Sequence, residues 1–260
     1  MYLNGVKISN TSAMHFSKLI FRSFLFILCL ILYIAHWIKY GEGGFGFIEA
    51  DSYFIWAIGT IYIIEMCFRF FPSQMESRGC QKQFEINFQP TGTSEAPRID
   101  NAAGTAKVII SWVVLNGIIA LLYYLGIIDQ GILILVSLAY SVCDMICILF
   151  FCPFQTWMMK NKCCGSCRIY NWDFIMMFTP CIMIKHPIAK VLFILAALLC
   201  VQWEVLYRKY PERFAENTNE FLQCKNCTEK LCSHKKQLQK YLVEFRKKLR
   251  EEKERIEEKL

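Results

Sequence analysis

Two short segments of the chain concentrate cysteine at spacings that suit metal ligation. The first lies near the C-terminus and combines a C-x2-C pair with a second pair of soft ligands: Cys224, Cys227, Cys232 and His234. A C-x2-C turn lets two thiolates approach one ion, and a second pair completes the tetrahedral shell that zinc prefers. Because only four residues separate the pairs, the spacing predicts a compact zinc knuckle or one half of a larger site. The alternative is a set of reduced thiols in a linker.

The second cysteine segment follows an apolar run in the middle of the chain. Its thiols are Cys152, Cys163, Cys164 and Cys167. Gly165 permits a tight turn, so these thiols could hold a zinc ion or an iron–sulfur cluster. Their spacing matches no ferredoxin pattern, which leaves a cysteine-rich loop without metal as the alternative. The aromatic and methionine residues of 168–180 could support a flat apolar ligand such as a quinone, although an interfacial aromatic belt is the simpler explanation.

Three polar side chains interrupt the apolar runs: Glu65, Asp144 and Asn116. Ionisable groups at membrane depth are costly and usually face a partner, a cavity or a proton path. The simpler alternative pairs Glu65 with Arg69, one helical turn along, and leaves Asp144 protonated or hydrogen-bonded. The three residues are therefore candidates for a polar path through the helices.

The composition indicates which elements must position these residues. Hydrophobic residues make up 55% of the 260 residues and charged residues only 20%, which is too apolar for an ordinary soluble domain. A helix needs about 20 apolar residues to cross a bilayer. Four runs of that length are clear, at 19–38, 53–71, 108–128 and 132–151. Pro180 and Pro187 interrupt the next region, which predicts two further spans near 173–187 and 188–207, or one span after a re-entrant segment.

The distribution of Lys and Arg predicts the orientation of the spans. These residues are frequent before the first run, in the loop 72–107 and in 155–172, and rare in 39–52 and around Asp129. By the positive-inside rule, the N-terminus and both basic loops face the cytoplasm. The basic C-terminal region belongs on the same side, which requires an even number of spans. We therefore expect an all-α, multi-pass protein of the cell membrane with about six transmembrane helices, five being the alternative.

This organisation divides the chain into three regions: a transmembrane domain at 1–207, a cytoplasmic cysteine-rich segment at 208–234, and an amphipathic or coiled-coil helix at 235–260. The last region has apolar residues at helical spacing among Lys, Arg and Glu, which predicts self-association. The interspersed Glu residues argue against nucleic-acid binding, and attraction to the lipid bilayer better explains the basic residues after the last span. In the loop 72–107, alternating Phe84, Ile86 and Phe88 predict a short strand and a turn.

Functions from different classes fit these features. The first is a membrane redox protein whose cytoplasmic metal–thiolate sites, holding zinc or an iron–sulfur cluster, pass electrons between a soluble redox partner and a membrane carrier. The second is a transporter-like or scaffold protein, in which structural zinc folds the tail and Glu65, Asp144 and Asn116 form the polar path. A thiol–disulfide enzyme using Cys163, Cys164 and Cys167 is a third hypothesis, weakened by the reducing side on which these thiols fall.

Overall fold

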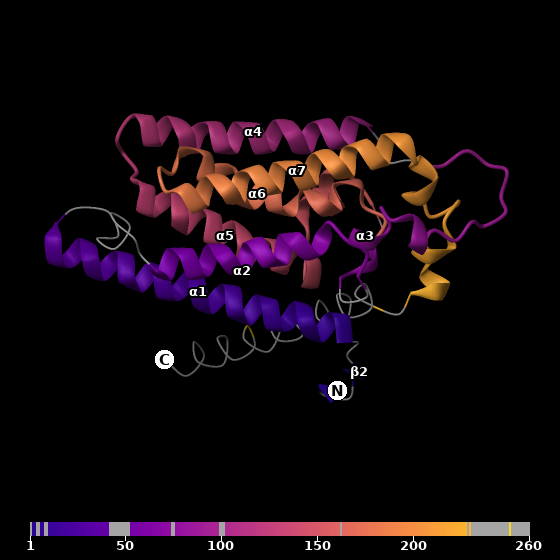
Figure 1. Cartoon of the computed structure of the whole chain (residues 1–260), viewed down its shortest axis with the longest axis horizontal. Helices are drawn as coiled ribbons and strands as arrows, with labels where there is room; N and C mark the ends of the chain where they lie inside the picture. Colours follow the sequence, from indigo (N-terminus) through magenta and orange to yellow (C-terminus); the bar gives the residue numbers. More distant parts are fainter. Residues whose placement is uncertain are drawn as a thin grey trace.

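The long elements of the protein are all helices, and they run side by side (Figure 1). The computed structural model describes residues 2–3, 6–7, 10–41, 53–73, 76–98, 102–161, 163–227, 229 and 250. The helices of the bundle are α1 (Asn10–Tyr40), α2 (Tyr53–Arg69), α4 (Ala102–Tyr124), α5 (Gln130–Leu149), α6 (Asp173–Phe178) and α7 (Pro187–Lys209). Among the described residues, the strands are limited to the two-residue pair β1 (Tyr2–Leu3) and β2 (Val6–Lys7).

Four of these helices are long and apolar enough to cross a membrane: Ser12–Tyr40 within α1, and α4, α5 and α7. The predicted helical fold is thereby confirmed, with four helices that are suited to cross a membrane. The second predicted span is shorter as a helix, because α2 has only 17 residues. The span predicted at 173–187 consists of α6 and a 3-10 helix, η4 (Thr179–Met183). A total of six crossings therefore stays a prediction.

Local sequence explains where several helices begin and end. Asp129 caps α5, because its side chain accepts a hydrogen bond from the backbone nitrogen of Ile132 at 2.8 Å. Helix α7 begins at Pro187, whose fixed φ and missing N–H suit the first turn of a helix. Pro180 falls where α6 gives way to the 3-10 helix η4, as expected of a residue that cannot donate a backbone hydrogen bond.

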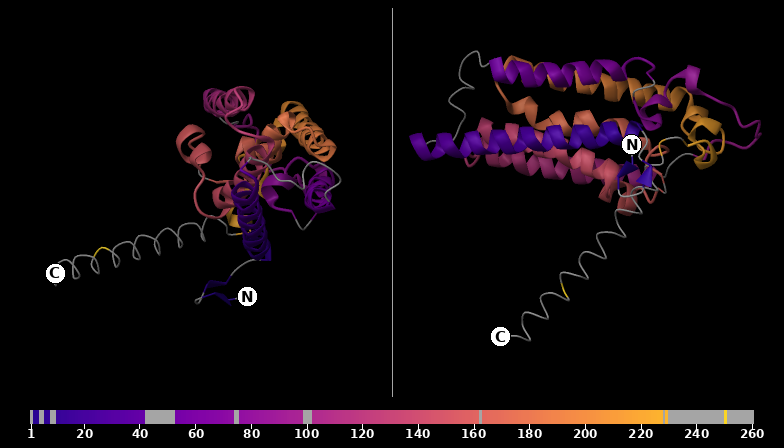
Figure 2. Two further views of the ribbon diagram at one scale, coloured as in Figure 1. Left: turned by 90° about the vertical axis from the view of Figure 1, so that its left-hand side faces the viewer. Right: turned by 90° about the horizontal axis from the view of Figure 1, so that it is seen from below.

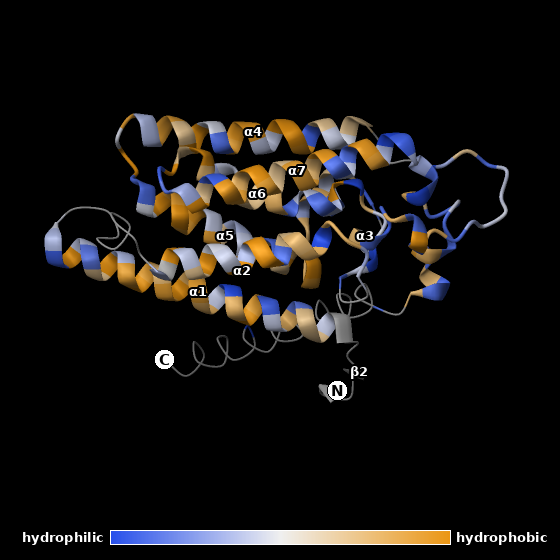
Figure 3. Cartoon of the chain, viewed as in Figure 1, coloured by the Kyte–Doolittle hydropathy of each residue, from blue (hydrophilic) through white to orange (hydrophobic). Residues whose placement is uncertain are grey.

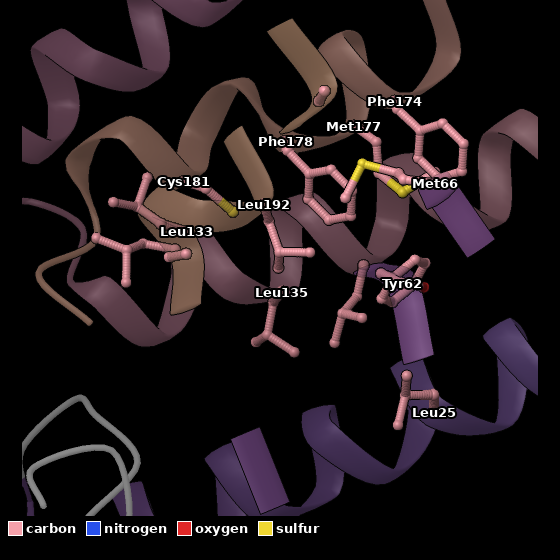
Figure 4. Close-up of a cluster of buried hydrophobic side chains, with 14 of the residues drawn as sticks. Leu25, Tyr62, Met66, Leu133, Leu135, Phe174, Met177, Phe178, Cys181 and Leu192 are labelled. Atoms are coloured by element: carbon pink, nitrogen blue, oxygen red, sulfur yellow. The ribbon is translucent and has the colours of Figure 1, made fainter. Parts of the chain in front are cut away.

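The bundle has an apolar core and an apolar outer surface. A buried cluster joins Met66 of α2, Leu133 of α5, Phe174 and Met177 of α6, and Leu192 of α7 (Figure 4). Apolar side chains also remain on the outer faces of the long helices (Figure 3), among them Ile31, Ile110 and Val201. An apolar exterior of this kind matches the hydrocarbon interior of a bilayer.

The polar segments gather at one end of the bundle (Figures 1 and 2). There the start of α1 meets the ends of α2, α5 and α7, together with the short helices α3 (Arg78–Gln81), η2 (Phe154–Met158), η3 (Arg168–Trp172), η5 (Pro211–Arg213), η6 (Glu220–Leu222) and η7 (Cys224–Asn226). These are the segments that the Lys and Arg pattern assigns to a common side. We call this the polar end; that it faces the cytoplasm stays a prediction.

The strand predicted around Phe84, Ile86 and Phe88 is wrong. Residues Glu85–Asn87 form the 3-10 helix η1, with local hydrogen bonds from Asn87 N to Phe84 O and from Phe88 N to Glu85 O. Close to this segment, Pro90 forms an isolated antiparallel β-bridge with Asn219. The alternation does not mark a buried sheet face, because Ile86 is 79% exposed. The predicted helix at 235–260 lies outside the described residues, apart from position 250.

Candidate functional site

A cavity of about 130 Å³ lies inside the polar end of the bundle, between α4, α5, α6 and the loop that carries the second cysteine segment. Its lining includes the thiols of Cys152, Cys164 and Cys167. It also includes the carboxylates Asp144 and Asp173. Aromatic and thioether side chains contribute flat apolar surface, among them Trp112, Tyr140, Met176 and Met177. The cavity thus combines thiols, carboxylates and flat apolar surface.

Two of these thiols lie on a tight turn. The backbone nitrogen of Cys167 donates to the carbonyl oxygen of Cys164 at 3.0 Å, which closes a β-turn over Gly165 and Ser166. The thiol of Cys164 donates to Oε1 of Gln155 at 2.8 Å. The backbone nitrogen of Gln155 in turn donates to the sulfur of Cys152 at 3.3 Å. Cys152 and Cys164 therefore both contact Gln155.

A buried lysine is attached to this turn. Nζ of Lys82 donates to the carbonyl oxygens of Gly165 at 3.1 Å and of Cys167 at 2.8 Å. The ammonium group also lies 5.2 Å from the ring centroid of Trp203, and the residue is 0% exposed. Lys82 therefore fixes the turn that carries Cys164 and Cys167.

The metal sites predicted from the sequence are not found in the described part of the chain. No group of three or more His, Cys, Asp or Glu side chains there is arranged to hold a metal ion. In the second segment, Cys163 does not line the cavity that Cys152, Cys164 and Cys167 share. The described residues of this loop therefore show no assembled metal site, and metal binding by Cys152, Cys163, Cys164 and Cys167 stays a prediction.

The tail site is described only in part. Cys224 and Cys227 are exposed and half-buried, respectively, whereas Cys232 and His234 lie outside the described residues. Cys224 lines a cavity of about 550 Å³ together with Asn161 and Ser166 of the second cysteine segment. The two cysteine-rich segments, separate in sequence, are thus neighbours at the polar end.

A buried guanidinium joins three helices and pairs with Asp144, which lines the cavity. Arg22 of α1 is 1% exposed. Its Nη1 lies 3.0 Å from Oδ2 of Asp144 on α5, and its Nη2 lies 3.0 Å from Oε2 and 3.1 Å from Oε1 of Glu65 on α2. Nη1 also donates to the carbonyl oxygen of Ser141 at 3.0 Å. The two intramembrane carboxylates predicted as candidates therefore share one cation.

Two further cations extend this arrangement. Nζ of Lys18 lies 2.7 Å from Oε1 of Glu65 and 3.5 Å from Oε1 of Glu76. Nε of Arg69 lies 3.5 Å from Oε2 of Glu76, and its Nη1 lies 2.6 Å from Oδ2 of Asp173. Asp173 lines the cavity, as Asp144 does. The ion pairs therefore form a continuous chain with both ends at the cavity; we call it the ion-pair chain.

The structure adds three findings to the sequence-based expectations at this site. Glu65 pairs with Arg22 and Lys18 rather than with Arg69, because Arg69 binds Asp173 and Glu76 from other elements. No described interaction joins Asn116 to the two carboxylates, and its Nδ2 donates to the carbonyl oxygen of Trp112 within α4 at 3.0 Å. The sequence analysis also missed Arg22, although a single Arg inside the first apolar run is a recognisable signal.

No protein-family model, curated protein sequence or solved structure matches the chain, so its function must be argued from this geometry.

Proposed function

We propose that the chain is a membrane thiol oxidoreductase, in which the Cys164–Cys167 pair passes electrons from a soluble dithiol partner on the cytoplasmic side to a quinone held in the cavity. The proposal retains electron transfer to a membrane carrier, as expected from the sequence, but assigns it to a pair of thiols instead of a metal–thiolate site. The observation that carries the proposal is a C-x2-C turn with both cysteines on the wall of a cavity lined by aromatic and methionine side chains.

The geometry of the turn suits a reversible disulfide. A β-turn brings its first and fourth Cα atoms within about 7 Å of each other, and disulfides span Cα separations of about 4.4–6.8 Å. Cys164 and Cys167 occupy these two positions. Both are buried, so the bond would form in the cavity rather than in water. A disulfide here requires rotation of side chains and little movement of the backbone.

The size and lining of the cavity suit a single ring. A dry protein cavity of about 150 Å³ accepts benzene, and this cavity measures about 130 Å³. Trp112 and Tyr140 lie 4.7 Å apart between ring centroids and provide flat apolar surface. The quinone head group is such a ring, and its apolar tail is compatible with the bilayer around α4.

The proposed reaction balances without a metal. Cys164 and Cys167 lose two electrons and two protons as the S–S bond forms, and the quinone takes up both to become a quinol. A soluble dithiol then reduces the disulfide by thiol–disulfide exchange. Lys82, which donates to the carbonyl oxygen of Cys167, keeps the turn that carries both thiols in place during each exchange. A reducing cytoplasm works against an enzyme that oxidises protein thiols. In the proposed reaction, the same compartment supplies the dithiol that donates electrons.

The test uses the full-length protein in nanodiscs, with dithiothreitol as electron donor and a short-chain quinone as acceptor. We expect quinol formation above the rate without protein, loss of that excess in Cys164→Ser and Cys167→Ser, and a Cys164–Cys167 disulfide in the peptide mass map after quinone addition. Cys67→Ser is the matched control, because Cys67 is exposed on α2 and outside the cavity. Quinol formation at the wild-type rate in both cavity variants would refute the proposal.

The transporter-like or scaffold alternative is favoured by a different observation, the ion-pair chain buried between α1, α2 and α5. Amides at Glu65 and Asp144 would then change transport or proton coupling while the metal content of the purified protein stays unchanged. The zinc site expected at Cys224, Cys227, Cys232 and His234 also stays a prediction. Metal analysis of the purified protein tests it, and a variant of the tail cysteines should lose the bound metal.

A further inference from the structure

The buried and half-buried charges near the cavity alternate in sign along one continuous series. Each neighbouring pair in the series lies within 3.5 Å. The order is Asp144, Arg22, Glu65, Lys18, Glu76, Arg69 and Asp173. A series that begins and ends with a carboxylate holds one more negative than positive charge. Four carboxylates therefore face three cations.

The surplus negative charge lies at the two ends of the ion-pair chain. Glu65 and Glu76, in the middle, each contact two cations, whereas Asp144 and Asp173 each contact one. Both end carboxylates line the same cavity. An uncompensated charge removed from water is costly, and proteins relieve that cost by protonation or by binding a cation. The charge that needs a proton or a cation therefore lies at the wall of the cavity.

We propose that Asp144 and Asp173 hold one exchangeable proton between them at the wall of the cavity. The proton neutralises the surplus charge, and the cavity gives it a route to a ligand. Two like charges at one site favour a single shared proton for the same electrostatic reason. This inference rests on the ion pairs and on the charge count, and it holds whatever the cavity binds. A quinone reduced there would consume such a proton.

The groups that face these two carboxylates come from several elements. Arg22 approaches from α1 and Arg69 from α2, and both are already counted. The remaining titratable groups around the cavity are Tyr140, Cys143 and Cys147 of α5, and Cys152, Cys164, Cys167 and Tyr170 of the loop. None of them carries a positive charge, so none replaces the missing cation.

His15 of α1 is the rival carrier of the proton. It is 3% exposed, and neither ring nitrogen has a hydrogen-bond partner within the described structure. It lies close enough to Lys18 and Glu76 to interact with them electrostatically. Burial of the ring, and then the neighbouring cations Lys18 and Arg69, oppose a positive charge on the imidazole. The proton therefore belongs on the carboxylates, and the test must separate the two locations.

Infrared spectroscopy distinguishes these locations, because a protonated carboxylic acid has a carbonyl stretch that imidazolium lacks. We expect wild-type protein in detergent at neutral pH to show such a band, shifted in D₂O. Asp144→Asn and Asp173→Asn should each remove it. Glu65→Gln should remove it as well, although both aspartates remain, because three carboxylates then balance three cations.

Two variants serve as controls. Glu204→Gln disrupts the separate pair of Glu204 with Arg168, 2.7 Å apart, and should leave the band unchanged. His15→Gln removes the rival carrier and should also leave it unchanged. The inference is overturned by a wild-type spectrum without the band, by loss of the band in His15→Gln, or by its persistence in Glu65→Gln. Because the wild-type spectrum needs no substitution, misfolding of an aspartate variant does not decide the result.

Discussion

Replacement of Arg22 by Met should destabilise the protein more than any single change on its surface. The guanidinium donates to the carbonyl oxygen of Ser141, to Asp144 and to both carboxylate oxygens of Glu65, at 3.0 to 3.1 Å. Methionine fills similar space but leaves two carboxylates facing each other without this cation. Removal of one partner from a buried ion pair costs about 3–5 kcal/mol, mainly because the remaining charge is desolvated and uncompensated.

The assay is unfolding in mixed micelles with increasing sodium dodecyl sulfate, followed by tryptophan fluorescence. Arg98→Gln is the matched control: its pair with Glu95 also measures 3.1 Å, but the Arg98 side chain is 78% exposed. An exposed pair contributes about 0–1 kcal/mol. The triple variant Arg22→Met, Glu65→Gln, Asp144→Asn removes the uncompensated charges and should recover most of the loss. A cost for Arg22→Met below about 1 kcal/mol, or a triple variant no more stable than the single one, would contradict this reasoning.

Two further predictions concern packing and protonation. In α4, a Cβ at Gly104 would lie 2.8 Å from the carbonyl oxygen of Met158, whereas Gly117 has open space; Gly104→Ala should therefore cost about 1–3 kcal/mol in the same assay, and equal stability of Gly104→Ala and Gly117→Ala would disprove the close contact. Burial, opposed by the Arg69 guanidinium, raises the pKa of the Cys80 thiol from 9.0 to about 12. Folding therefore favours the protonated thiol, and this stabilisation is complete below pH 9 and lost as the pH rises towards 12. At pH 9 a maleimide should label exposed Cys224 quickly and native Cys80 only after unfolding, and rapid labelling of Cys80 in the folded protein would contradict this.

The positions of the long helices, and much of their boundaries, follow from local sequence. The apolar runs at 19–38, 108–128, 132–151 and 188–207 all lie within or overlap the long helices α1, α4, α5 and α7. This succeeds because insertion into hydrocarbon depends on the length and polarity of one segment, which are properties of consecutive residues. The Lys and Arg pattern likewise grouped the segments that meet at the polar end. Pro180 and Pro187 marked the interruption between α6 and α7 for a similarly local reason.

The pairing of the charges, in contrast, depends on how the helices pack. Sequence spacing favours an ion pair between Glu65 and Arg69 on one face of α2. In the structure, Arg22 of α1 pairs with Glu65, and Arg69 pairs with Asp173. Likewise, four cysteines that resemble one ligand set divide between a cavity wall and the loop outside it. The rotation of each helix is set by packing against its neighbours, and an ion pair between helices depends on two such rotations at once. That information is distributed over the whole core and is absent from the spacing within any one segment.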